Sequence, residues 1–175
     1  MSIDKDEFEA EREKLRKLQA IFEKAVENNS IDDIKPFTHA DFSFVSFTDK
    51  SFDSFDAFKN QWEITRSEMV GSGRFSTQLN PAPTIFVDDI AIASGNAQNT
   101  LVNASGEQFN FSNHWTVIFK RVDNDWKVLR AHNSLDPFAN PMLVSGVKRN
   151  IIKYSALAFL GGAALCSVIS YLIPG

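Results

Sequence analysis

Apolar residues recur at two different periods along this chain of 175 residues. Over residues 8–29 they return every three or four positions, which predicts one amphipathic helix ending near two asparagines. A second stretch with this spacing covers residues 55–69, where Ser54 can cap the helix and Gly71 can end it. Between these stretches, Ser30 begins a short helix that Pro36 limits.

The period changes to two after residue 73, and the pattern then predicts strands. A strand is also expected earlier, at residues 41–47, where phenylalanines alternate with small residues. The later strands are expected at residues 74–79, 84–87, 90–102, 107–120 and 126–134. Helices therefore come first and strands follow, which predicts an α+β domain with its helices packed on one face of a curved antiparallel sheet.

The last two predicted strands form a hairpin around the polar turn Asp123-Asn124-Asp125. In the first of them the bulky apolar side chains occupy odd positions, so Trp115 and its odd neighbours should face the core. In the second, strict alternation puts even positions on one face: Trp126, Val128, Arg130, His132 and Ser134.

Composition and charge exclude several classes of function. The formal net charge is −4 and basic residues do not cluster in the domain, so no nucleic-acid partner is expected. Cys166 is the single cysteine, which rules out a disulfide within the chain. The three histidines are scattered and no phosphate-binding glycine loop is present, so we expect neither a metal nor a cofactor.

The closing motif Trp126-Lys127-Val128…His132…Ser134, after a long helix, a short helix, a strand and a glycine-ended helix, resembles the SnoaL-like branch of the NTF2-like superfamily. The resemblance covers roughly residues 8–138. It implies a cystatin-like cone with a cavity between sheet and helices, and a homodimer formed through the sheet. Relatives include isomerases, cyclases, dehydratases and hydrolases as well as assembly domains, so the resemblance leaves the function open.

Three residues are candidates for catalysis. His132 could act as a general base at a cavity wall, with Arg130 beside it on the same strand. The alternative is a histidine that is hydrogen-bonded at the sheet surface or at a dimer interface. Asp41 opens the first predicted strand, near where some relatives place a catalytic carboxylate, but the favoured alternative is a turn residue between helix and strand.

The segment Tyr154–Ile173 contains twenty residues without a charge. A helix of this length spans about 30 Å, which is the thickness of a bilayer's hydrocarbon core. We therefore expect a soluble domain over residues 1–140, a basic linker over 141–150 and a transmembrane helix over 151–173. The basic flank predicts a single-pass tail anchor with the domain in the cytoplasm.

Two functions follow from these expectations. The first is a membrane-tethered assembly module that dimerises and holds a small apolar ligand, or another membrane protein, beside the bilayer. The second is a cofactor-free enzyme of the SnoaL type that acts on a small hydrophobic substrate, with His132 as the base.

Overall fold

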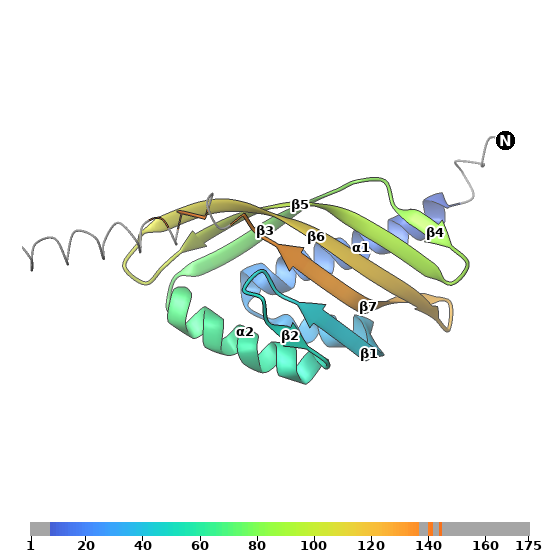
Figure 1. The fold of residues 1–175 in the computed structure, drawn as a ribbon, viewed down its shortest axis with the longest axis horizontal. Coiled ribbons are helices and arrows are strands. Elements are labelled where there is room, and N and C mark those ends of the chain that lie inside the picture. Colours follow the sequence, from blue (N-terminus) through green and yellow to red (C-terminus); the bar gives the residue numbers. More distant parts are fainter. Residues whose placement is uncertain (1–7, 137–139, 142–143, 145–175) are drawn as a thin grey trace, which may run out of the picture. The chain divides into compact units, whose positions relative to one another are not determined.

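The computed structural model describes residues 8–136, 140, 141 and 144, and the chain divides into two compact units, residues 1–136 and 137–175. The helices and strands whose bounds are assigned lie in the first unit (Figure 1). They are α1 (Glu9–Asn28), the 3-10 helix η1 (Ile31–Phe37), β1 (Thr38–Val45), β2 (Ser51–Phe52), α2 (Phe55–Met69), β3 (Arg74–Pro81), β4 (Ile85–Val87), β5 (Ile90–Val102), β6 (Gln108–Val122) and β7 (Asp125–Ser134). Every predicted element of this unit is present, with ends shifted by a few residues.

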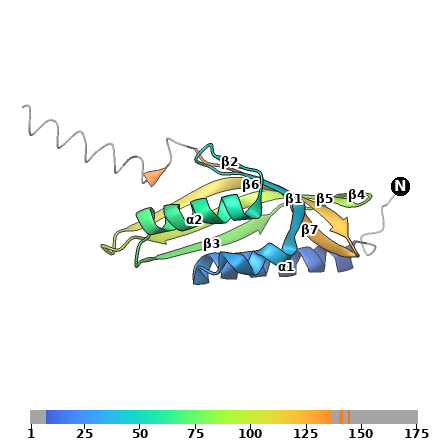
Figure 2. The ribbon, with the colours of Figure 1, turned by 90° about the horizontal axis from the view of Figure 1, so that it is seen from below.

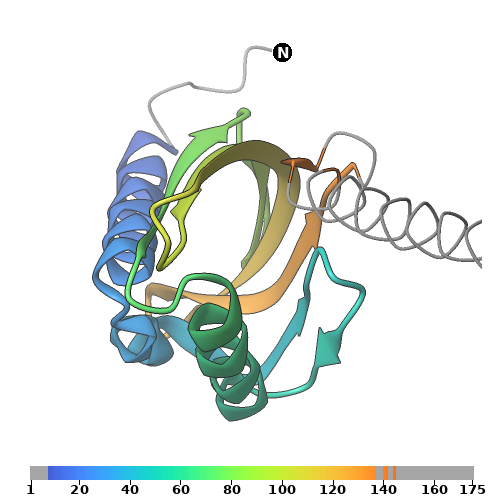
Figure 3. The ribbon, with the colours of Figure 1, turned by 90° about the vertical axis from the view of Figure 1, so that its left-hand side faces the viewer.

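Seven strands form one sheet in the order β2-β1-β7-β6-β5-β3, and β4 pairs with β5. The sheet curves, and both α-helices run along it on its concave side (Figures 2 and 3). All strand pairs are antiparallel, as predicted, except one: β1 lies parallel to β7. That prediction was wrong at this pair since β1 belongs to the helical half of the sequence, and no local pattern indicates which distant strand it joins.

Gly95 lies in the middle of the long strand β5, where β3 and β5 approach closely. A Cβ atom at this position would lie 2.2 Å from the carbonyl oxygen of Asn80, a distance that no side chain tolerates. A glycine inside a strand commonly marks such an approach or a bend. Gly95 therefore allows the two strands to stay paired from Arg74 to Pro81 while the sheet curves.

Two hydrophobic clusters fill the space between the sheet and the helices. The first joins α1 to the middle of the sheet and includes Leu15, Ala91, Ala93, Ala97, Trp115, Phe119 and Trp126. The second joins α2 and η1 to β1 and includes Val26, Ile31, Phe42, Phe55 and Phe58. Val128 packs against both, so the clusters form one continuous interior.

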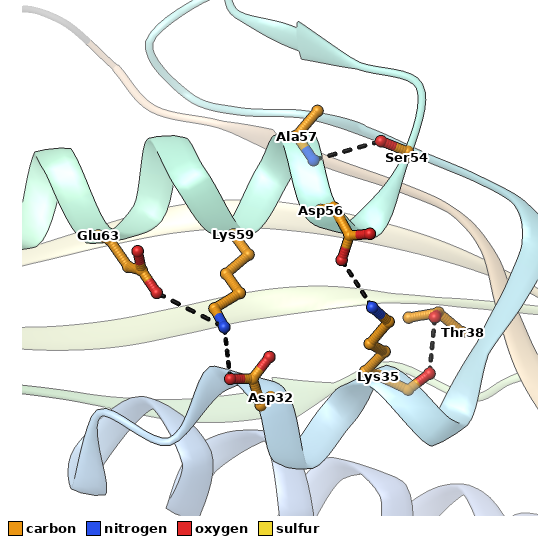
Figure 4. Close-up of polar contacts among 8 residues, drawn as sticks. All are labelled: Asp32, Lys35, Thr38, Ser54, Asp56, Ala57, Lys59 and Glu63. Carbon is orange, nitrogen blue, oxygen red and sulfur yellow. Dashed lines mark hydrogen bonds and ion pairs between the residues drawn. The ribbon is translucent and has the colours of Figure 1, made fainter.

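Polar contacts hold α2 against η1 (Figure 4). The Ser54 hydroxyl accepts a hydrogen bond from the backbone N–H of Ala57 at 3.2 Å, as predicted for a helix cap. Lys59 lies 2.5 Å from Asp32, and this contact raises the pKa of the lysine. Lys35 pairs with Asp56 at 2.7 Å. Because these charges are largely exposed, they orient the helix more than they stabilise the fold.

Polar contacts attach the N-terminal helix to the β6–β7 hairpin, where Lys14 also donates to the carbonyl oxygen of Asn124 at 3.1 Å. Glu11 accepts a hydrogen bond from the indole N–H of Trp126 at 2.7 Å and lies 3.5 Å from the guanidinium of Arg121. The Arg121 guanidinium stacks 4.6 Å from the centre of the Trp126 ring. Since Trp126 is 2% exposed, its N–H has little access to water if Glu11 is removed.

Replacing Glu11 with alanine should therefore lower the free energy of unfolding by about 1–3 kcal/mol, the usual result of leaving a buried donor unpaired. The control is Glu13→Ala on the same helix, where an exposed ion pair with Arg16 is lost. We expect the control to change stability by less than about 0.5 kcal/mol. Equal losses in urea denaturation would show that the Trp126 contact contributes nothing specific.

Candidate functional site

A break in the alternation of β7 decides which side chains face the interior. Phe119 pairs with Val128, but the next residue of β6, Ile118, pairs with Arg130, so Leu129 is an extra residue without a partner. Such a bulge reverses the facing of all residues beyond it. Trp126 and Val128 therefore point inward, whereas Arg130, His132 and Ser134 point outward.

The predicted sharing of one face by Trp126, Arg130 and His132 is accordingly wrong. His132 lies opposite Thr116 on β6 and beside Val45 on β1, and its side chain is exposed on the convex side of the sheet. Arg130 lies opposite Ile118 and is exposed as well. A bulge of one residue leaves no sign in the hydrophobic pattern, because Leu129 and Ala131 are as compatible with the interior as Val128.

Asp41 lies in the stretch of β1 that does not pair with β7, since pairing stops after Thr38 and resumes at Ser43. Its backbone N–H donates to Nδ1 of His39 at 3.0 Å, and its carboxylate lies 3.7 Å from the same nitrogen. The Asp41 side chain is 87% exposed. Among the described residues no hydrogen bond or ion pair joins Asp41 to His132 or Arg130, and their catalytic roles stay predictions.

The interior between sheet and helices is largely aromatic. Nine rings are in continuous contact, with neighbouring centroids 4.9–6.4 Å apart. They belong to Phe42, Phe44, Phe47, Phe52, Phe55, Phe58, Trp62, Phe75 and Phe111. Such contacts, at offset or edge-to-face angles, bind the strands β1 and β6 to α2.

Polar groups interrupt this interior in one row of β5 and β6. Asn99 and Asn113 are each 6% exposed, and the Asn99 amide donates to Oδ1 of Asn113 at 2.7 Å. Next to them Trp115 is 8% exposed, and within the described residues its indole N–H has no hydrogen-bond partner. Asn133 of β7 lies opposite Trp115 in the pairing. The row could therefore donate a hydrogen bond to a small molecule that enters the interior.

These asparagines were not identified as candidates from the sequence. Asn113 sits at an odd position between Phe111 and Trp115, on the face predicted to be buried. A polar residue at a core position of a strand is the signal that could have selected it. On α2, burial lowers the pKa of Arg66, whose Nη1 also lacks a hydrogen-bond partner among the described residues.

The convex face of the sheet has a different composition. Thirteen neighbouring positions on β3, β5, β6 and β7 carry amides, hydroxyls and two imidazoles and no charged side chain, although Asp, Glu, Lys and Arg make up 23% of the chain. Arg74, Lys120 and Arg130 lie on the same face at the borders of this set. We call this set the uncharged face. It consists of Ser76, Gln78, Asn80, Ser94, Asn96, Gln98, Thr100, Asn110, Ser112, His114, Thr116, His132 and Ser134.

Neighbouring side chains of the uncharged face bond to one another across strands. The Thr100 hydroxyl donates to Oδ1 of Asn110 at 3.0 Å, and the Gln108 amide reaches the same oxygen at 3.2 Å. A row of aliphatic residues borders the face, where Ile85, Ile92 and Ile118 lie side by side on β4, β5 and β6. Ile85 is 59% exposed.

Comparison with family models gives a match over residues 11–137 to the calcium/calmodulin dependent protein kinase II association domain. The chain belongs to this family of association domains. Comparison with curated proteins gives no match. The fold is the NTF2-like, cystatin-like α+β fold that the closing motif predicted, with a curved sheet and N-terminal helices.

Three solved structures illustrate how widely this fold is used. A putative calcium/calmodulin dependent protein kinase II association domain from Xanthomonas campestris has a TM-score of 0.53 at 14% identity, covering 70% of this chain and 83% of that chain. An NTF2-like protein from Salmonella enterica serovar Typhimurium has a TM-score of 0.62 at 12% identity, covering 70% of this chain and 89% of that chain. A hexachlorocyclohexane dehydrochlorinase has a TM-score of 0.65 at 12% identity, covering 73% of this chain and 86% of that chain.

At these identities the similarity establishes the fold of the association domain and nothing about its chemistry. No group of three or more His, Cys, Asp or Glu able to hold a metal occurs in the described part of the chain. Among the same residues, no helix is long and apolar enough to cross a bilayer. The predicted transmembrane helix at residues 151–173 lies outside the described residues.

Proposed function

We propose that this association domain is an assembly module that pairs with a second copy of itself through the uncharged face. The observation that carries the proposal is a continuous patch of thirteen uncharged polar side chains across four adjacent strands, β3, β5, β6 and β7, in a chain that is 23% charged; Arg130 lies at its border on β7. The cores of protein interfaces are depleted in charged residues, because burying an unpaired charge is costly. The family's own description as an association domain supports the same function.

The chemistry of the face suits pairing with an identical surface. In a twofold dimer the same patch meets itself, so a charge near the twofold axis would lie close to its own copy, and a charge elsewhere on the patch would find no opposite charge facing it. Amides and hydroxyls avoid this problem, since each can both donate and accept hydrogen bonds across the twofold axis. The aliphatic row at Ile85, Ile92 and Ile118 adds apolar area at the border of the same surface.

We propose further that the segment after the domain tethers it to a membrane. The support comes from the sequence, in which Tyr154–Ile173 has no charge and Lys148, Arg149 and Lys153 precede it. The module would then present a dimer on the cytoplasmic side of the bilayer, beside any other membrane protein that it holds.

A second candidate function is the binding of a small molecule in the interior. It is favoured by the buried indole N–H of Trp115, which lies beside the Asn99–Asn113 pair without a partner among the described residues. A ligand for this row would be mostly apolar, to suit the aromatic rings, and would carry one hydrogen-bond acceptor. Turnover with His132 as the base stays a prediction, because the bulge directs that side chain to the opposite face.

Native mass spectrometry of the full-length protein, released gently from detergent, tests both candidates. The assembly proposal predicts a mass of two chains or a multiple of two. The ligand proposal predicts an additional small mass that disappears in the Trp115→Phe variant, which removes the indole N–H but keeps an aromatic ring. Monomers alone would contradict the assembly module, and an unchanged spectrum in Trp115→Phe would contradict the interior site.

A further inference from the structure

Two histidines occupy the middle of the uncharged face. His114 of β6 lies opposite Ser134 of β7, and His132 of β7 lies opposite Thr116 of β6. The two imidazoles are thus diagonal neighbours on one face of an antiparallel pair, about 7–8 Å apart at their Cα atoms. Both side chains are exposed in the single chain.

The surroundings of the histidines offer almost nothing to balance a positive charge. On β5, Asn96 lies beside His114, and on β1, Val45 lies beside His132; neither carries a charge. The nearest charged side chain along the strand is Arg130, two residues from His132 and therefore about 7 Å along β7. On β1, the carboxylate of Asp41 lies four residues before Val45, in the stretch that precedes the partner of Arg130. The nearest acidic residue along the chain is Asp136, which follows the end of β7.

Protonation of the two histidines changes the net charge of this surface. A histidine side chain gains its charge between about pH 8 and pH 5. With His114 and His132 neutral, the middle of the face has no charge. With both protonated, it carries two positive charges next to Arg130, and among the described residues no ion pair joins either imidazole to a carboxylate.

We infer that His114 and His132 make the pairing of the sheet faces depend on pH, so that acidification separates the two copies. The inference rests on the proposed function, because it requires the uncharged face to be the dimer interface. In a twofold dimer four imidazolium groups would be brought together, and like charges across an interface disfavour association strongly. The fold of each chain should persist, since both imidazoles lie outside the hydrophobic clusters.

The test is sedimentation velocity of the full-length protein in non-ionic detergent at about pH 8 and about pH 5.5, the interval in which histidine is titrated. The wild-type protein should be dimeric at the higher pH, and its dissociation constant should rise by about tenfold or more at the lower pH. The double variant His114→Gln, His132→Gln cannot gain these charges and should stay dimeric at both pH values. Tryptophan fluorescence checks that each sample remains folded.

The possible outcomes separate the two proposals. A wild-type protein that is monomeric at about pH 8 contradicts the proposed interface itself, whatever happens on acidification. A wild-type dimer that persists at the lower pH contradicts the histidine inference but does not contradict the proposed interface. The inference also fails if the double variant dissociates or unfolds on acidification as the wild-type protein does, because the histidines would then not be the cause.

Discussion

The variant Trp115→Ala is expected to lose about 3–5 kcal/mol of the free energy of unfolding. Trp115 is 8% exposed and packs in the cluster that joins α1 to the middle of the sheet. Removing the indole leaves a cavity that the rigid strand pairs around it cannot close. The measurement is urea denaturation followed by far-UV circular dichroism.

Trp115→Phe is the graded control for this prediction. The indole N–H has no hydrogen-bond partner among the described residues, so the phenylalanine variant loses ring area but no hydrogen bond. We expect it to lose less than about 1.5 kcal/mol, as for similar core replacements. A loss below about 1 kcal/mol in the alanine variant would mean that Trp115 is not part of the packed core.

Removing everything after Val147 is expected to change the location of the protein from membrane pellet to supernatant. The predicted span Tyr154–Ile173 would be deleted, whereas all helices and strands with assigned bounds end by Ser134. The truncated protein should therefore show a cooperative thermal transition. Full-length protein should remain in the pellet after carbonate or high-salt washing, because salt removes electrostatic attachment and leaves a buried span in place.

The variant Leu160→Arg controls for the mechanism of attachment. An arginine near the centre of the span raises the cost of insertion by about 2.5–3.5 kcal/mol on translocon-derived scales, so the pelleted fraction should fall. Full-length protein that washes off with salt would contradict the membrane anchor. A truncated protein that aggregates without a thermal transition would show that the segment after Val147 is required for folding.

The elements could be predicted from the sequence because each buried face repeats at its own period. Odd positions of β6 bury Phe111, Trp115 and Phe119, and Ser54 caps α2 as its spacing indicated. The partners of β1 could not be predicted in this way. Its pairing with β7 joins residues almost ninety positions apart, and hydrophobic alternation carries no information about such a distance.

The candidate site was the less predictable part, and the reason is one unpaired residue. Strict alternation placed His132 and Arg130 with Trp126, but the bulge at Leu129 moves both to the other face of the sheet. The same alternation did place Asn113 in the interior, where it bonds Asn99. The uncharged face emerges only when four strands are aligned in register, since its members are distributed from Ser76 to Ser134.

The central claim is that two copies pair through the uncharged face. Thr116 lies in the middle of it, between Ser94 and His132, and its side chain is exposed in the single chain. In a dimer, Thr116→Lys would place an ammonium group against the same surface of the second copy, where no acidic side chain receives it. The matched control is Ile64→Lys on α2, a position that is 52% exposed and outside the sheet.

The most direct test is therefore the dissociation constant measured by sedimentation velocity for the wild-type protein and both lysine variants, in full-length form and after truncation at Val147. We expect the wild-type protein and Ile64→Lys to be dimeric, and Thr116→Lys to bind its partner at least about 100-fold more weakly, since like charges at an interface core cost several kcal/mol. A Thr116→Lys variant that dimerises as tightly as Ile64→Lys would contradict the account.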